Sequence, residues 1–401
     1  MNVFRKTYCR TVHAACKIAL PFLPYKNPGI IQKAEDIAGA IAKNGKKKPL
    51  IVTGKTVGSL EITKRAEQAI LNSGLSYCVY DKVVANPTTD NVEEALEFYK
   101  KEGCDCLVAF GGGSPMDCAK AVGALVARPD KTVNGLGGVM KVKKKIPLLI
   151  AVPTTAGSGS ETTLASVIVD ARTRHKYAIS DFNLIPSYAV LDEELILSLP
   201  RFVAATTGMD ALTHAIEAFI GKGGNKQTRA DALEAIKLIF ENLETFCFER
   251  TAESARNMLL ASHKAGRAFT RSYVGYVHAL SHTISGKFDV AHGLANAVIL
   301  PVVLREYGNS VHKKLWEIAI YCNLADKRAP RKIAARSVIE RIEELNAKFS
   351  IPEKLATIKR EDIEKLAAYA DREANPLYPV PVLWDRKKLA SMYEKFCEIE
   401  S

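Results

Sequence analysis

The sequence has little of what marks fibrous, disordered or membrane-spanning chains. Glycine and proline are not enriched, with 25 Gly and 17 Pro in 401 residues. No apolar run approaches the length of a membrane span, and no internal repeat or low-complexity tract is present. The hydrophobic fraction of 47% and the charged fraction of 25% are those of a chain that folds compactly. The length favours two domains of roughly 200 residues each.

Cysteine pairs suited to disulfides or to zinc are also missing. The nine cysteines are odd in number and mostly isolated in apolar stretches, which is typical of reduced cytosolic thiols. Cys104 and Cys106 are not followed by a second Cys or His pair at zinc-ribbon spacing. We therefore expect neither a disulfide framework nor a structural zinc ion at these cysteines.

Acidic residues are scarce at the N-terminus, where Glu35 is the first, and the net charge is +12. Segment 1–26 is basic and mildly apolar, but basic residues interrupt it too often for a secretory signal. The lysine runs at 46–48 and 143–145 precede apolar stretches and lack interleaved aromatics, which indicates solvated loops. The sequence predicts a cytoplasmic protein that binds neither nucleic acid nor membrane.

The first half alternates short apolar runs with amphipathic helical patterns. Helices are predicted at 92–102 and 115–127, and strands at 49–54, 76–81, 106–113, 147–155 and 188–192. This order predicts a parallel α/β sheet covered on both faces, the architecture that binds nucleotides at its strand ends.

Beyond Pro200 long amphipathic patterns such as 226–246 and 253–271 predict an all-helical second half with hardly any strand. We place a dinucleotide-binding α/β domain at 1–200 and a helical domain at 201–401. A cleft between two such domains would shield a ligand from water.

Two glycine-rich loops follow apolar strands. In "FGGGSPMD" (110–117) we expect Ser114 to cap a helix, with Pro115 in its first turn and Asp117 three residues after the cap. Free backbone N–H groups and a helix N-terminus suit a pyrophosphate, although a plain tight turn is the alternative. The second loop, "PTTAGSGSETT" (153–163), adds hydroxyls at the same sheet edge, and the pair favours cofactor binding.

One carboxylate and several histidines recur at helical spacing. Asp210 and His214 are four residues apart in "TGMDALTHAIEAF", and His278 and His282 repeat the spacing, with His292 following after a glycine-containing turn. For any single histidine an ordinary hydrogen-bonded role is the commoner one. Together, four of these five residues could form one site for Fe²⁺ or Zn²⁺.

The motifs "GGGSPMDCAK", "PTTAGSGSE", "TGMDALTHAIEA" and "VHALSH…AHGLANAVILP" together resemble the iron-dependent, group III alcohol dehydrogenases. The resemblance runs from about residue 49 to the end, and "ANPLYPVP" (374–381) is similar to a subset of that family. It implies a Rossmann-like domain, a helical domain, and a divalent ion, usually Fe²⁺ and sometimes Zn²⁺. The implied ligands are Asp210, His214, His278 and His292, and His282 matches a histidine near the nicotinamide that is a candidate for the proton path.

The resemblance also implies the cofactor contacts. The first glycine loop would contact the pyrophosphate, two threonines of the second loop would contact the cofactor, Lys176 matches a lysine near the nicotinamide ribose, and Asn86 matches an asparagine beside the adenosine half. The candidate cofactor residues are Gly54, Asn86, Gly112, Gly113, Ser114, Asp117, Thr154, Thr155 and Lys176.

Two departures from the family pattern concern specificity. In "VTGK", Gly54 stands where many NAD-preferring relatives carry the carboxylate that repels a 2′-phosphate. NADP(H) is therefore expected to be tolerated or preferred, with NAD(H) also possible. After His282 the chain has "ISG" rather than a glycine-rich "LGG", with Phe288 and Asp289 beyond, which leaves the substrate open.

The expected activity is reversible oxidation of a small primary alcohol or diol, or reduction of the matching aldehyde, by a homodimer or larger homo-oligomer. Glycerol dehydrogenase-like and dehydroquinate synthase-like enzymes share the two-domain plan, but they typically carry "GGGK" in place of "GGGS". A non-catalytic assembly protein is the alternative from another class.

Overall fold

The computed structural model describes residues 1–400, which form two compact units. The sheet unit comprises Pro24–Pro200 and Arg250–Gly266. The helical unit comprises Met1–Leu23, Arg201–Glu249 and the residues from Arg267 onward. The chain thus passes from the sheet unit to the helical unit after Pro200. Two segments are exceptions: Met1–Leu23 belongs to the helical unit, and Arg250–Gly266 belongs to the sheet unit.

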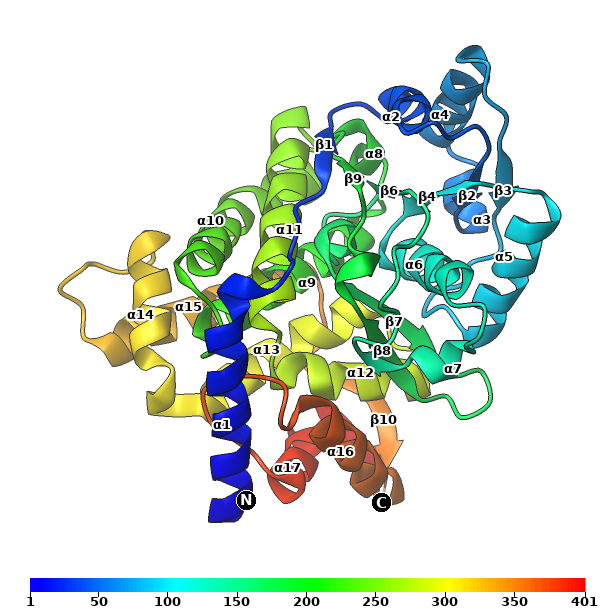
Figure 1. Ribbon diagram of the computed structural model, residues 1–401. Helices are drawn as coiled ribbons and strands as arrows, with labels where there is room; N and C mark the ends of the chain where they lie inside the picture. Colours follow the sequence, from blue (N-terminus) through cyan, green and yellow to red (C-terminus); the bar gives the residue numbers. More distant parts are fainter. Residues whose placement is uncertain (401) are drawn as a thin grey trace. The chain divides into compact units, whose positions relative to one another are not determined.

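Six parallel strands form the centre of the sheet unit. Their order is β1-β9-β6-β4-β2-β3, and Figure 1 shows them side by side in this order. The strands β2, β4 and β6 are wholly buried, because helices cover both faces, and this explains their near-continuous apolar runs. Their bounds are β1 Gly29–Ile31, β2 Pro49–Val52, β3 Cys78–Tyr80, β4 Cys106–Gly111, β6 Leu149–Pro153 and β9 Tyr188–Val190.

Seven α-helices and a smaller sheet complete this part of the described chain. The helices are α2 Ile37–Lys43, α3 Lys55–Gly58, α4 Glu61–Asn72, α5 Thr89–Lys101, α6 Gly113–Ala127, α7 Val133–Leu136 and α8 Glu194–Leu197. The smaller sheet has the order β5-β8-β7, with β5 Gly138–Val139, β7 Ala165–Val169 and β8 Lys176–Ser180. The short 3-10 helix η3, Ser160–Thr162, lies in the second glycine loop.

Helix α6 starts earlier than the sequence suggested. Gly112 is its N-cap residue, no side chain caps it, and Gly113 is its first residue. The prediction that Ser114 is the cap is therefore wrong. Gly111 has φ +153° and an added Cβ would lie 2.6 Å from Cγ of Pro115, so glycines make the tight entry into the helix possible.

The helical unit is built around α9, whose residues 209–220 are all buried. Its helices are α1 Val3–Ala19, α9 Arg201–Ile220, α10 Lys226–Phe248, α12 Tyr276–Phe288, α13 His292–Tyr307, α14 His312–Tyr321, α15 Arg331–Lys348, α16 Arg360–Ala374 and α17 Arg386–Phe396, while α11 Ala252–Ser272 contributes to both units. Two short parallel strands, β10 Leu355–Lys359 and β11 Cys397–Glu400, were not predicted. Their pairing partners lie about forty residues apart in sequence, so no hairpin signal announces them.

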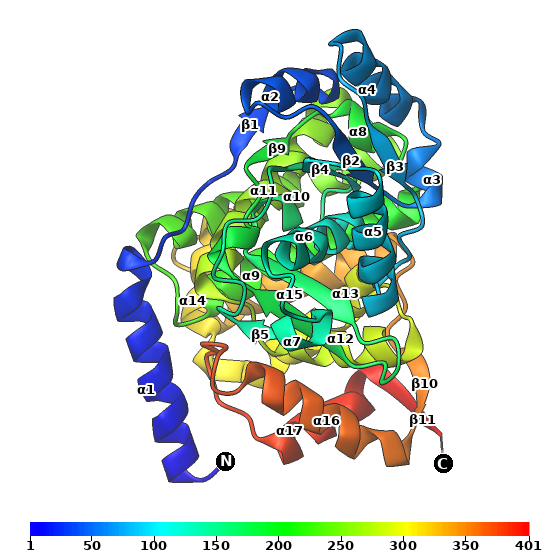
Figure 2. The same cartoon turned by 45° about the vertical axis from the view of Figure 1, so that its right-hand side comes forward.

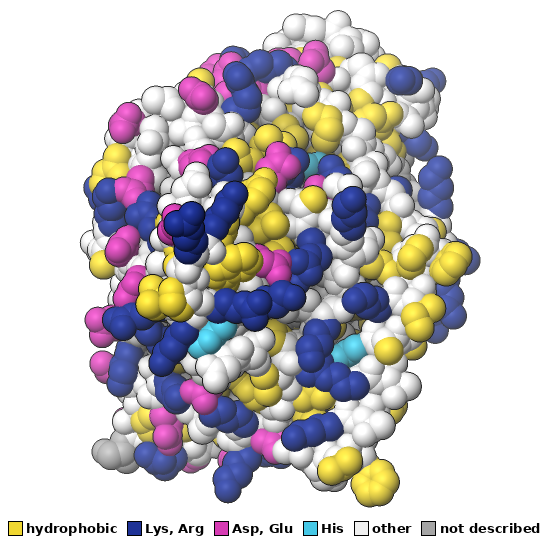
Figure 3. Space-filling view, turned by 90° about the vertical axis from the view of Figure 1, so that its left-hand side faces the viewer, with side chains coloured by type: hydrophobic (Ala, Val, Ile, Leu, Met, Phe, Trp, Pro, Cys, Tyr) yellow, Lys and Arg dark blue, Asp and Glu magenta, His cyan; other side chains and the backbone are white. Residues whose placement is uncertain are grey.

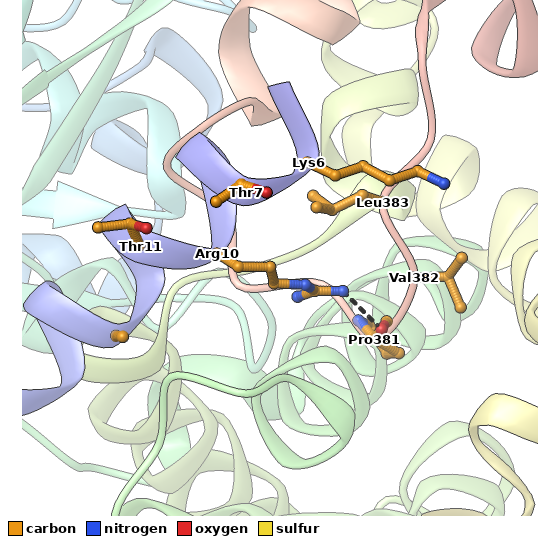
Figure 4. Close-up of a pocket in the computed structure, with 8 residues that line it drawn as sticks. Lys6, Thr7, Arg10, Thr11, Pro381, Val382 and Leu383 are labelled. Atoms are coloured by element: carbon orange, nitrogen blue, oxygen red, sulfur yellow. Dashed lines mark hydrogen bonds between the residues drawn. The ribbon is translucent and has the colours of Figure 1, made fainter. Parts of the chain in front are cut away.

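Helix α1 is anchored to the C-terminal part of the helical unit. Arg5 binds both carboxylate oxygens of Asp371 at 2.8 Å. Arg10 donates to the carbonyl oxygens of Val380 and Pro381 at 2.8 and 2.9 Å, and Figure 4 shows its guanidinium reaching across the groove that α1 forms with residues 381–383. Residues 1–23 of the basic N-terminal segment are thus part of the fold of this unit.

On the face in Figure 3, Lys and Arg are interspersed with acidic and apolar side chains. The lysines at 143–145 are all exposed, as solvated loop residues are. None of the helices within residues 1–400 is both long and apolar enough to cross a bilayer.

Candidate active site

Three helices of the helical unit bring one carboxylate and three imidazoles together. Asp210 and His214 lie one turn apart on α9, His278 lies in the first turn of α12, and His292 is the first residue of α13. One ligand atom from each residue lies within 4.8 Å of the others. These are the four residues that the resemblance assigned to a metal, and the structure places them in one cluster.

The cluster depends on a close approach of α13 to α9. A Cβ atom at Gly293 would lie 2.4 Å from the carbonyl oxygen of Thr206 and 3.4 Å from Cβ of Asp210. Glycine is therefore required next to His292. The turn that precedes α13 contains no glycine, contrary to the prediction, and Asp289 takes its left-handed position with φ 54°. Aspartate tolerates this conformation better than most residues do.

A buried carboxylate orients one of the histidines. Oε2 of Glu217 lies 2.6 Å from Nδ1 of His278, and the same carboxylate accepts the N–H groups of Gly275 and Val277 at 2.8 Å. Burial raises the pKa of Glu217 to about 7, against the lowering effect of these N–H groups. Engaging Nδ1 leaves Nε2 of His278 for a metal, as is common for metal-binding histidines.

The amide of Asn296 lies within the cluster itself. Its Nδ2 donates to Oδ1 of Asp210 at 2.6 Å and lies 3.1 and 3.2 Å from Nε2 of His278 and of His292. The sequence analysis missed both Asn296 and Glu217. Helical spacing was the available signal, since Asn296 follows His292 by four residues and Glu217 follows His214 by three.

The residues fit a divalent transition metal. One carboxylate and three imidazoles are the borderline ligand set that Fe²⁺ and Zn²⁺ accept. Asp210, His214 and His278 are buried, and His292 is partly exposed. The four side chains would hold such an ion, and the partly exposed side at His292 would leave access for a substrate oxygen.

His282 lies beside this cluster. Its ring stacks on that of His292, with centroids 5.0 Å apart and planes at 25°. Its Nδ1 lies 2.7 Å from Oε1 of Glu373 on α16. His282 is thus not one of the four clustered residues, and its Nδ1 contacts the carboxylate of Glu373.

In the sheet unit the two glycine loops touch each other. An added Cβ at Gly112 would lie 3.2 Å from Oγ1 of Thr155, and one at Gly113 would lie 3.1 Å from Cβ of Ser158. The N–H of Thr154 donates to the carbonyl oxygen of Gly111 at 3.0 Å. The candidate loop residues therefore lie together at the carboxyl ends of the neighbouring strands β4 and β6, where α/β sheets bind nucleotides.

The carboxylate of Asp117 is engaged within the protein. It accepts the hydroxyl of Ser160 at 2.8 Å and the N–H of Val167 at 3.1 Å. Lys120, one turn later and fully buried, donates to oxygens of Ser160, Thr163 and Ala165, and burial lowers its pKa to about 8. Both side chains thus tie α6 to the second loop.

Two other candidate cofactor residues bond to each other. Nζ of Lys176 donates to Oδ1 of Asn86 at 2.8 Å. A part of the cofactor that contacts Lys176 would therefore lie close to Asn86 as well, whereas the resemblance assigns these residues to opposite halves of the dinucleotide. Gly54, the residue before α3, has ordinary extended angles, and an added Cβ would lie 3.1 Å from the carbonyl oxygen of Val83.

The fold and the cluster define a protein with an α/β unit, a helical unit and a candidate metal site, and comparison with known proteins identifies the family. Residues 30–193 match the family described as iron-containing alcohol dehydrogenase, and residues 204–397 match the C-terminal part of the Fe-containing alcohol dehydrogenase family. The chain belongs to this family, as its motifs predicted.

Individual relatives agree with this assignment. The chain is 35% identical to the 1,3-propanediol dehydrogenase of Citrobacter freundii, over 88% of this chain and 92% of that protein. A crystal structure of a 1,3-propanediol oxidoreductase superposes with a TM-score of 0.87 at 31% identity, covering 92% of this chain and 98% of that one. The sulfoacetaldehyde reductase of Bifidobacterium kashiwanohense, solved in complex with NAD⁺, has a TM-score of 0.79 at 28% identity, covering 92% and 97%.

The predictions about fold class and activity are confirmed at this level. The protein is an oxidoreductase of the iron alcohol dehydrogenase family that acts on alcohols or aldehydes with a nicotinamide cofactor. The N-terminal half carries the parallel sheet and the C-terminal half is helical apart from β10 and β11.

Proposed function

We propose that the protein interconverts a small primary alcohol or diol and its aldehyde with NADP(H). In the oxidative direction the alcohol and NADP⁺ give the aldehyde, NADPH and one proton. The observation that carries this proposal is the convergence of Asp210, His214, His278 and His292 to within 4.8 Å. The name of the relative from Citrobacter freundii, 1,3-propanediol dehydrogenase, supports a short diol as one substrate class.

Each residue of the cluster has a role in this reaction. A bound Fe²⁺ or Zn²⁺ supplies Lewis acidity toward the substrate oxygen, and the nicotinamide accepts or returns the hydride. Asp210 and the three histidines hold the ion, and Glu217 fixes the imidazole of His278. His282 accepts the hydroxyl proton and passes it to water.

The sheet unit binds the dinucleotide in this proposal. Backbone N–H groups of Gly112, Gly113 and Ser114 at the start of α6 bind the pyrophosphate, because a helix N-terminus favours anions. Thr154 and Thr155 of the adjacent loop contact the rest of the cofactor. Asn86, Asp117 and Lys176 stay predicted as cofactor residues. Asp117 would act indirectly, because its carboxylate accepts a hydrogen bond from the hydroxyl of Ser160 in the second loop.

The preference for NADP(H) rests on Gly54. No carboxylate stands at this position to bind a ribose 2′-OH or repel a 2′-phosphate, and Lys55 beside it is exposed and positively charged. We also propose a cytoplasmic location, which the nine free cysteines support. The proposed assembly is a homodimer or a larger homo-oligomer.

One set of measurements tests the proposal. The protein is purified anaerobically, analysed for metal, reloaded with Fe²⁺ or Zn²⁺, and assayed with NADPH and NADH against propanal and 3-hydroxypropanal. We expect one bound ion per chain and faster turnover with NADPH. His278→Ala should lose both metal and turnover, whereas the control His312→Ala, on α14 and outside the cluster, should keep both.

Two results would reject parts of the proposal. A protein that holds the ion but reduces no short aldehyde with either cofactor would favour the non-catalytic assembly role. Clear NADH preference would reject the reasoning about Gly54 while leaving the alcohol dehydrogenase chemistry intact.

A further inference from the structure

A second carboxylate–histidine pair lies next to the metal cluster. His282 on α12 and Glu373 on α16 are joined through Nδ1 and Oε1 at 2.7 Å. The hydroxyl of Tyr378 donates to the same oxygen, also at 2.7 Å. Figure 2 shows α16 next to α12, with α17 at its side. Neither Glu373 nor Tyr378 was among the residues predicted from the sequence.

The partners decide which nitrogen of His282 carries a proton. An ionised carboxylate has only acceptor atoms, so the Nδ1 that faces Glu373 must be the donor. Burial by itself raises the pKa of Glu373, but the charge of His282 and the hydrogen bonds from His282 and Tyr378 hold it below its ordinary value. With Nδ1 turned toward Glu373, Nε2 is the ring nitrogen directed away from this carboxylate.

The position of the ring makes this tautomer relevant to catalysis. His282 stacks on His292 at 5.0 Å between centroids and presents an edge to His278 at 6.0 Å and 77°. Its side chain is only 13% exposed. The imidazole is thus held beside two of the four candidate ligands, and Glu373 is the anionic group that fixes its orientation.

We infer that Glu373, supported by Tyr378, is a positioning residue that fixes the imidazole of His282 beside the cluster, with Nδ1 toward Glu373. The inference rests on the proposed function and supplies part of its proton path. In the proposed function, the hydroxyl proton lost in oxidation would pass to this imidazole, and a bound nicotinamide would take the hydride. The imidazolium, stabilised by the anionic Glu373, then returns its proton to water.

Kinetics of matched variants form the first test. Glu373→Gln keeps the size of the side chain and removes its charge, so we expect kcat to fall by about 10- to 100-fold, as for other carboxylates behind functional histidines. KM for NADPH and the metal content should not change. Tyr378→Phe removes one of the two donors to the carboxylate and should lower kcat by a smaller factor.

Two control variants separate positioning from general disturbance. Glu364→Gln alters a carboxylate of the same helix, which is exposed and pairs with Arg386. Tyr393→Phe removes a buried hydroxyl that contacts Thr283, the neighbour of His282, without touching the imidazole. Both should retain kcat. An unchanged kcat in Glu373→Gln, or an equal loss in Tyr393→Phe, would overturn the inference.

A spectroscopic measurement tests it without turnover. In zinc-loaded protein with ¹⁵N-labelled histidine, two-bond ¹H–¹⁵N correlations report the tautomer, and His282→Asn assigns the signals. We expect His282 protonated at Nδ1 in the unaltered protein and a loss of this fixed tautomer in Glu373→Ala. Protonation at Nε2 in the unaltered protein would overturn the inference, even if Glu373→Gln fails to fold. Absence of turnover in unaltered, metal-loaded protein would instead reject the proposed function.

Discussion

Gly293→Ala is the substitution for which the structure gives the sharpest expectation. The added methyl group would lie 2.4 Å from the carbonyl oxygen of Thr206 on α9, where ordinary carbon–oxygen contacts are about 3.3 to 3.6 Å. Because the obstacle is backbone, side-chain rotation cannot relieve the overlap. The start of α13 must therefore move away from α9 by about 1 Å, and His292, the preceding residue, must move with it.

This displacement affects both stability and metal binding. Overpacking of this kind typically costs about 1–3 kcal/mol, which exceeds the gain of about 0.5–1 kcal/mol that alanine brings over glycine in a helix. Metal–ligand distances tolerate about 0.2 Å, so a shift of about 1 Å removes His292 as an effective ligand. We expect the free energy of unfolding to fall by about 1–2 kcal/mol and zinc affinity to fall by at least about tenfold.

A matched glycine provides the control. Gly39 lies within α2, and an added Cβ there would meet nothing within 4 Å. Gly39→Ala should therefore raise the free energy of unfolding by about 0.5–1 kcal/mol and leave zinc affinity unchanged. Urea denaturation measures the first quantity, and competition with a chromogenic chelator measures the second. Gly293→Ala protein that binds zinc as tightly as the unaltered protein would refute the reasoning.

Three further substitutions test other parts of the structure. Glu217→Gln should weaken zinc binding by about 10- to 100-fold in the same competition assay, because His278 loses the carboxyl group that orients its Nδ1. Equal affinity would contradict this role. Lys120→Met removes a buried amine whose pKa falls from 10.5 to about 8 on folding. Between pH 8 and 10.5 the amine is protonated in the unfolded state and neutral in the folded state. The free energy of unfolding of the unaltered protein should therefore rise with pH relative to that of the variant, by up to about 3 kcal/mol. Urea titrations from pH 8 to 10.5 measure this difference. A pH-independent difference would show that the amine keeps its ordinary pKa. Gly54→Asp should shift the ratio of kcat/KM for NADPH and NADH about tenfold toward NADH, roughly 1.4 kcal/mol, whereas Gly54→Ala controls for the contact with Val83 and should leave the ratio unchanged.

Local patterns in the sequence determined the elements that carry the site. Apolar runs fixed the strands β2, β4 and β6, because strands buried on both faces must be apolar throughout. Helical spacing placed Asp210 and His214 on one face of α9. Motif resemblance, rather than spacing alone, selected which four of the five candidate residues hold a metal.

Two features of the fold were not predicted correctly from the sequence. The start of α6 was misplaced by one to two residues, since the sterically favoured cap proved to be a glycine without a capping side chain. The pairing of β10 with β11 joins segments about forty residues apart, and such pairing leaves no local pattern.

The sequence by itself determined the family, the α/β and helical halves, and the identities of the candidate ligands. Only the tertiary structure decided which groups support them. Glu217 and Glu373 are ordinary helical glutamates in the sequence, and they become partners of His278 and His282 because α9, α12 and α16 pack together. Hydrogen bonds across helices require distances of about 3 Å between residues many positions apart, and only side-chain packing fixes such distances.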